Sequence, residues 1–134
     1  IGGALVDVFH HFGVSDAWYS HQGAIRASGK KLATILINEI ENLYVCNIMT
    51  YLKPMDTTAL FKVLYVPPEI KERALEPMTS IMQETGEEVP LETFKNTLVA
   101  CFGDKLGVRI NEGKLTRDEL IAYEKNRALA GRLV

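Results

Sequence analysis

The sequence lacks several features that mark common classes of protein. No apolar run approaches the roughly 20 residues that a membrane-spanning helix needs. Among the longest is the stretch from Leu32 to Ile37, which contains Thr34. The formal net charge is −2, so the chain has no broad basic field that would indicate nucleic-acid binding. We therefore expect it to bind neither membranes nor nucleic acids.

Histidine and cysteine are scarce, at 3 and 2 residues. His10 and His11 are adjacent and would point about 100° apart on a helix, and no CxxC or HExxH spacing is present. We therefore expect no metal site. Cys46 and Cys101 lie in apolar stretches, which is typical of reduced core residues and favours the cytoplasm. No G-x-S-x-G, G-x-x-x-x-G-K-[ST] or G-x-G-x-x-G motif occurs either.

What is present is the composition of a soluble globular protein, with 47% hydrophobic and 24% charged residues. A length of 134 residues fits one ordinary domain or two very small ones. The chain begins with Ile1 rather than methionine, which we interpret as a trimmed or partial chain.

The order of apolar and turn residues predicts an α+β fold in which an antiparallel or mixed sheet precedes several helices. The stretch from Leu32 to Ile37 predicts a strand that is covered on both faces, and Thr116 to Glu119 fits a capping box. Along one predicted helix, Leu91, Phe94, Leu98 and Phe102 share a face that we expect to be buried against the last helix. Helices are predicted over 4–12, 57–65, 68–81, 90–106 and 117–129, and strands over 25–27, 31–38, 43–51 and 108–110. We expect Pro77 to bend or interrupt the helix over 68–81.

Lys30 and Lys31 stand directly before the apolar stretch. An exposed turn is the ordinary place for lysine. Neighbouring residues on a strand project to opposite faces, so one of the two must point toward whatever lies beneath the sheet. A lysine held there can offset negative charge that develops on an acyl or phosphoryl oxygen. Spacing alone leaves both interpretations open.

Four segments carry a family resemblance: ASGKKLATILI, YVCNIMTYLKPMDTTALFKVLYVP, TSIMQETGEEVPLETFKNTLVACFGDKLGV and GKLTRDEL. In this order the chain resembles lipoate–protein ligases of the biotin/lipoate protein ligase superfamily, and Phe61 to Pro67 is the best match. The resemblance implies that residues 1–66 are the C-terminal portion of a catalytic domain and that residues 67–134 are a small, mostly helical accessory domain.

The resemblance also implies a reaction. In that family a lysine in a Gly-Lys-Lys-like turn approaches the carbonyl of lipoyl-adenylate and supports acyl transfer to a lysine of a lipoyl domain. This puts the catalytic role on Lys31, which we expect to face a pocket while Lys30 faces solvent. Thr34 and Thr50 fall at substrate-binding positions. ATP with magnesium, lipoyl-adenylate and a lipoyl-domain acceptor protein are implied by the family.

The sequence departs from the family at several site positions. Gly23-Ala24 replaces an Asn-Asp pair, Thr34 replaces a glycine, Ile48-Met49 replaces His-Gly, and Pro77 replaces an arginine. The glycine-rich segment with paired arginines that holds lipoate and nucleotide in the family would precede Ile1. We therefore expect that the chain alone binds no cofactor and activates no lipoate. A missing activating half or partner subunit would supply that step, in an oligomer or heteromer.

Two other functions stay open. A non-catalytic relative could keep the fold and act as an interaction or scaffold subunit, because the departures fall at site positions. An acyltransferase that uses Cys46 as its nucleophile would need a base, and the sequence places no histidine beside it.

Overall fold

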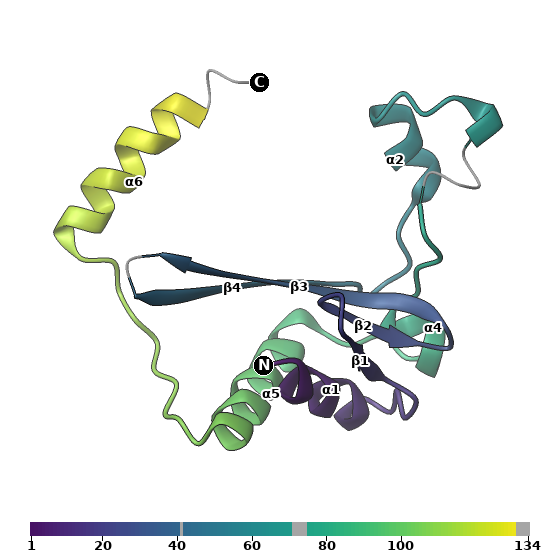
Figure 1. Cartoon of the computed structure of the whole chain (residues 1–134), viewed down its shortest axis with the longest axis horizontal. Helices are drawn as coiled ribbons and strands as arrows, with labels where there is room; N and C mark the ends of the chain where they lie inside the picture. The colour runs from purple at the N-terminus through teal and green to yellow at the C-terminus, as the bar shows by residue number, and fades with distance from the viewer. Residues whose placement is uncertain (41, 71–74, 131–134) are drawn as a thin grey trace.

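The computed structural model describes residues 1–40, 42–70 and 75–130, the side chains of 128–130 excepted. The strands form one antiparallel sheet in the order β1-β2-β3-β4, and the helices α1 and α5 lie against one of its faces (Figure 1). The predicted α+β fold is confirmed. The elements are α1 (Gly2–His11), β1 (Trp18–Ser20), β2 (Ala24–Ala27), β3 (Lys30–Ile40), β4 (Leu43–Thr50), α2 (Thr57–Val63), a 3₁₀ helix η1 (Pro68–Ile70), α4 (Ile81–Thr85), α5 (Leu91–Leu106) and α6 (Arg117–Ala130).

The central hairpin forms where the sequence predicts it, because its turn residues suit the turn. Ser28 and Gly29 both have positive φ, at 50° and 73°, which is the backbone conformation of a tight two-residue hairpin turn. β2, β3 and β4 confirm the three predicted strands within a few residues of their predicted ends. β1 was not predicted, because three residues are too few to show the alternation of apolar and polar positions that marks a strand.

The ladder between β2 and β3 contains one extra residue. Ile25 pairs with Ala33, yet the next residue, Arg26, pairs with Lys31. Leu32 is therefore the extra residue of a β-bulge, because β3 has one residue more than β2 between these two pairs. Paired residues share a face of the sheet, so the bulge places Lys31 with Arg26 on the face opposite Ala33.

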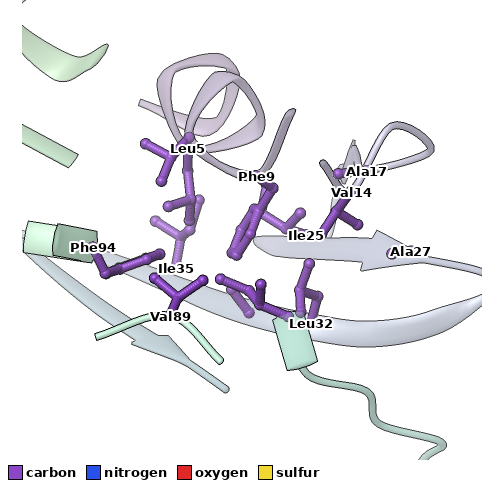
Figure 2. Close-up of a cluster of buried hydrophobic side chains, with 13 residues drawn as sticks. Leu5, Phe9, Val14, Ala17, Ile25, Ala27, Leu32, Ile35, Val89 and Phe94 are labelled. Atoms are coloured by element: carbon purple, nitrogen blue, oxygen red, sulfur yellow. The ribbon is translucent and has the colours of Figure 1, made fainter. Parts of the chain in front are cut away.

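The core lies between α1, α5 and the other face of the sheet. Leu5 and Phe9 of α1 point toward Ile25 and Ile35 of the strands, and Phe94 of α5 reaches the same cluster (Figure 2). This one core is built from residues on both sides of position 66. The division of the chain into domains at that position stays a prediction. The buried members are Leu5, Val8, Phe9, Val14, Ala17, Ile25, Ala27, Leu32, Ala33, Ile35, Ile81, Val89 and Phe94.

The apolar face of α5 packs against α1, and not against the last helix as we expected. Phe94 is buried and its ring stacks on that of Phe12, with centroids 5.8 Å apart. Leu98 and Phe102 are half-buried against the same cluster, whereas Leu91 is exposed. α6 stands away from α5 at the end of an extended segment (Figure 1). The face prediction was right for most of its members and wrong about what covers them.

The segment predicted as a helix over 68–81 is mostly not helical. It begins with the short 3₁₀ helix η1, and residues 71–74 lie outside the described residues. Pro77 then accepts a hydrogen bond from Lys31 through its carbonyl oxygen, and Met78 forms a parallel β-bridge with Lys31. Proline has no N–H for a helix, so this part of the chain pairs with the sheet instead. α4 begins only at Ile81.

The predicted strand over 108–110 is absent from the structure, which describes these residues as irregular. Val108 donates its N–H to the carbonyl of Gly103, and Gly107 has φ 62°. Both are features of a helix that ends on a left-handed glycine. By contrast, the capping box before α6 is confirmed: Thr116 Oγ1 accepts from the N–H of Glu119 at 3.3 Å, and the Glu119 carboxylate accepts from the N–H of Thr116 at 2.7 Å.

The apolar run of β3 is covered on one face only, contrary to the prediction. Leu32 and Ile35 are buried, but Leu36 and Ile37 are exposed. The reason is that α1 and α5 cover only one face of the sheet, and that the β3–β4 hairpin continues past them (Figure 1). Within the described ranges, no helix combines the length and the apolarity that crossing a bilayer requires.

Candidate functional site

Lys31 is held by backbone hydrogen bonds from two sides. Its N–H donates to the carbonyl of Pro77 at 2.8 Å, and its carbonyl accepts from the N–H of Thr79 at 2.9 Å. On the other side it pairs with Arg26 of β2. The start of β3 therefore lies between a strand and the segment 77–79, which fixes the position from which the Lys31 side chain projects.

The turn that precedes Lys31 is anchored by two carboxylates. The N–H of Ser28 donates to Asp16 Oδ2 at 2.7 Å, and its hydroxyl donates to Glu84 Oε2 at 2.8 Å. The hydroxyl of Thr79 also donates to the Glu84 carboxylate. Glu84 thus ties the turn to the segment 77–79 on the far side of Lys31.

The two lysines have different surroundings, and the pairing follows the alternation expected of a strand. Lys30 pairs with Ala27 and is exposed, whereas the side chain of Lys31 is 22% exposed. The Lys31 ammonium forms an ion pair with the carboxylate of Glu76. Arg26 Nη2 donates to the same carboxylate at 2.7 Å. Two cations on one face of the sheet therefore share a single acid.

The Glu76 carboxylate is stabilised in its charged form. The hydrogen bond from Lys31 is the largest cause of a lowered pKa for Glu76; slight burial acts in the opposite direction, and the hydrogen bond from Arg26 adds to the lowering. Hydrogen bonds to a charged form favour that form. Glu76 is therefore ionised at neutral pH and offsets part of the charge of the two cations.

A pocket of about 400 Å³ opens beside this cluster. Tyr51 after β4, Phe61 of α2, Glu76, Met78 and Thr79 belong to its wall. Its size falls in the usual range for a small-molecule site, roughly 300–1,000 Å³. The Lys31 side chain is not part of the lining and contacts it through Glu76.

Thr34 and Thr50, the two other predicted site residues, lie on opposite faces of the sheet. Thr34 pairs with Met49 and shares the face of Lys31, which we call the outer face. Thr50 pairs with Ala33 and so projects from the core side. The structure therefore groups Lys31 with Thr34 by face and separates Thr50 from them. The roles of all three stay predictions.

The hydroxyl of Thr50 has an unusual environment. It is buried, and it has no hydrogen-bond partner among the described residues. Buried polar side-chain atoms are nearly always paired in native structures, so an exception calls for an explanation. A group that meets a bound molecule is one such explanation.

Two site residues were missed from the sequence. Arg26 could have been found by pairing β2 with β3, had the bulge at Leu32 been anticipated. No pattern around Glu76 indicates that it belongs to the site, because its segment was predicted to be helical. The bridge between Met78 and Lys31 is what brings Glu76 to Lys31.

The thiol of Cys101 does not have the surroundings of a nucleophile in this structure. Both cysteines are free and half-buried. Burial raises the pKa of the Cys101 thiol, and the nearby carboxylates of Asp7 and Asp104 raise it further. Thiols become reactive in electropositive surroundings that lower the pKa, and the surroundings of Cys101 act in the opposite direction.

Two solved structures have the same arrangement of helices and strands as this chain. The chain superposes on lipoate-protein ligase A, solved with ATP bound, with a TM-score of 0.66 over 91% of this chain. The chain has the fold of a lipoate–protein ligase. It also superposes on the bi-partite lipoate protein ligase of Thermoplasma acidophilum, a protein of an archaeal lipoylation system with an E2 lipoyl domain, with a TM-score of 0.69 over 91% of this chain. The sequence identities are 20% and 15%.

The ligase fold is shared over only part of those proteins. This chain covers 50% and 49% of the two solved chains, so it spans about half the length of the structures it matches. A scan against protein-family models finds no match, and a search of curated proteins finds none either. The likeness is therefore one of three-dimensional structure.

Proposed function

We propose that this chain supplies Lys31 to a lipoate–protein ligase-like reaction. The reaction is the transfer of a lipoyl or octanoyl group from its adenylate to a lysine of a lipoyl domain. The observation that carries the proposal is the place of Lys31, which is fixed at the start of β3 beside a pocket of about 400 Å³ in a ligase fold.

The chemistry of the transfer explains what Lys31 would do. The amine nitrogen of the acceptor lysine attacks the carbonyl carbon of the acyl-adenylate, and the bond from that carbon to the phosphate oxygen breaks. AMP leaves with the electron pair, the amine loses a proton, and an amide forms. Negative charge develops on the carbonyl oxygen and the leaving phosphate, where a preorganised ammonium is most effective. The backbone bonds of Lys31 to Pro77 and Thr79 supply that preorganisation.

The activation of lipoate with ATP would be done by another part of the enzyme. Both solved ligases are about twice as long as this chain, and one of them is bi-partite. The outer face of the β3–β4 hairpin exposes Leu36, Ile40, Leu43 and Met49, an apolar surface of the kind that partners cover. We propose that an activating half lies against this chain and that a lipoyl domain is the acceptor.

Magnesium is implied by the family only. No three His, Cys, Asp or Glu side chains come together in the part of the chain that the structure describes. These residues therefore offer no cluster of three such ligands for the ion.

The first prediction tests Lys31 against its neighbour. Lys31→Ala should reduce single-turnover transfer from preformed lipoyl-adenylate to a lipoyl domain by roughly 10²–10³-fold, the usual cost of one lost donor to a developing oxyanion. Lys30→Ala is the matched control and should stay within a few-fold, because Lys30 is exposed on the opposite face. The assay is run with the activating half supplied.

Two outcomes would contradict the proposal. Equal loss from both substitutions would mean that the lysines act by general electrostatics. No loss from either, or no transfer by the unmodified protein, would favour the alternative, a non-catalytic relative that acts as an interaction or scaffold subunit. The exposed apolar hairpin is the feature that favours that alternative.

A further inference from the structure

Glu76 occupies the place where a bound anion would meet Lys31. Its carboxylate contacts both Lys31 and Arg26. Glu76 also lines the pocket, while Lys31 contacts the pocket wall through it. The pocket therefore presents an acid in front of its cations, an arrangement that opposes the binding of any negatively charged molecule.

We propose that Glu76 is a built-in competitor for the anion that this site binds, and that a phosphate group enters by displacing the Glu76 carboxylate from Lys31 and Arg26. The identity of that group as the phosphate of an acyl-adenylate rests on the proposed function. The exchange itself rests on the ion pairs and on the pocket. Glu76 thus sets how strongly the site discriminates against weak anions.

The chemistry of the three groups suits an exchange of partners. An incoming phosphate carries negative charge and several acceptor oxygens, so it can accept from the guanidinium and the ammonium together, as the carboxylate does now. A neutral acyl ester carries no negative charge to replace that of the displaced Glu76 carboxylate. Only a ligand with an anionic group therefore gains from reaching the two cations.

The position of Glu76 allows it to leave. Its side chain is 39% exposed, and ion pairs open to solvent contribute little to stability. The residues after it stay bridged to β3 through Pro77 and Thr79, so rotation of the side chain into water is sufficient. Once it has rotated, Lys31 and Arg26 face each other as like charges, and an anion between them relieves that repulsion.

The test measures anion binding without any acyl transfer. AMP and inorganic phosphate are titrated into the full chain at an ionic strength of about 0.1 M, where charges more than about 10 Å apart are largely screened, and binding is followed by calorimetry. Glu76→Gln keeps the shape and removes the charge, so we expect AMP to bind roughly fivefold more tightly, the scale of one charge contact that is open to solvent. Glu88→Gln is the matched control, since it removes the same charge from an exposed pair with Lys53. It should change the affinity by less than about twofold, because Glu88 does not line the pocket and contacts neither Lys31 nor Arg26.

A second substitution locates the effect. Lys31→Met added to Glu76→Gln should abolish the gain. Equal tightening by Glu76→Gln and Glu88→Gln would reduce the effect to net charge and overturn the inference, as would no tightening by Glu76→Gln. If that variant does not fold, Glu76→Asp shortens the reach of the acid and should tighten AMP binding in the same direction by a smaller factor.

The outcomes separate this inference from the proposed function. Tighter AMP binding by Glu76→Gln in a chain that supports no transfer would uphold the competitor and overturn the proposed reaction. Transfer that depends on Lys31, with anion binding indifferent to Glu76, would overturn the competitor alone.

Discussion

Thr50 is the single residue that the packing of this chain explains least. Its backbone pairs with Ala33 in a regular ladder, and its hydroxyl is buried without a partner among the described residues. An unpaired buried hydroxyl costs stability, about 1–3 kcal/mol in mutational studies of proteins. A chain that keeps such a group gains from it elsewhere, and binding of a substrate oxygen or amide is a direct use.

We expect Thr50→Val to separate stability from function. Valine has the same shape without the hydroxyl, so the free energy of unfolding should be unchanged or higher by up to about 1 kcal/mol. Transfer should fall by roughly 5–10-fold if the hydroxyl makes one hydrogen bond to the substrate, a bond worth about 1 kcal/mol. Both are measured on the same preparation, by denaturant titration and by the single-turnover assay.

Thr85→Val is the control for the unfolding measurement, because the Thr85 hydroxyl donates to the carbonyl of Ile81 at 2.9 Å. It should lower stability where Thr50→Val does not. A clear loss of stability in Thr50→Val would show that its hydroxyl is satisfied within the fold. Unchanged transfer would remove Thr50 from the site.

The candidate site was only partly predictable from the sequence. Lys31 could be singled out because the turn, the strand and the family resemblance all involve neighbouring residues. Its partner Glu76 could not, because no local pattern shows that the residues around Pro77 pair with β3. The face on which Lys31 lies was also hidden, since it depends on the bulge at Leu32. The contacts between segments that are distant in the sequence could not be predicted from it.

At the scale of elements, patterns located the helices and strands better than they located their partners. The apolar side of α5 was identified by its spacing for Phe94, Leu98 and Phe102, but not for Leu91, which is exposed. The spacing predicts which side of a helix is buried, but it does not predict which element covers that side. Here α1 and the sheet do so, through Phe9 and Phe12 on one side and Phe94 on the other. The same limit explains why α6 was expected on α5.

Phe94→Ala should be strongly destabilising. The side chain is 4% exposed and its ring contacts those of Phe9 and Phe12. Loss of a buried aromatic side chain costs about 3–5 kcal/mol, measured as a change in the free energy of unfolding. Leu91→Ala is the matched control on the same helix, where the side chain is 57% exposed, and should cost less than about 0.5 kcal/mol. Comparable effects of the two substitutions would place the packed side of α5 elsewhere.

At the scale of the whole molecule, the buried side chains are concentrated in one region. Two parts extend away from it: α2 and the segment after it on one side, and α6 on the other (Figure 1). All described side chains from Asp104 to Arg127 are exposed. The β3–β4 hairpin projects between these two parts with apolar residues on its outer face. An exposed surface of this kind favours association.

We expect the isolated chain to associate with itself, and to exchange that contact for a heteromer when the activating half is supplied. Sedimentation measures both. Leu36→Lys on the outer face should shift the chain toward monomer, because a charge there opposes burial. Leu91→Lys is the matched control, since both leucines are 57% exposed. A monodisperse monomer of the unmodified chain, indifferent to either substitution, would argue against a divided enzyme.

The bulge at Leu32 lets two residues that stand two apart, Lys31 and Ala33, lie on opposite faces of the sheet. Between the residue paired with Ile25 and the residue paired with Arg26, β3 takes two steps where β2 takes one. Deleting Leu32 would leave Lys31 next to Ala33 and still paired with Arg26, so the lysine would keep the outer face. A regular ladder that retained Leu32 would instead pair Lys31 with Ala27 and turn the lysine toward the core side. A shorter β3 therefore conserves the orientation of its lysine, whereas a β3 of the same length without the bulge inverts it.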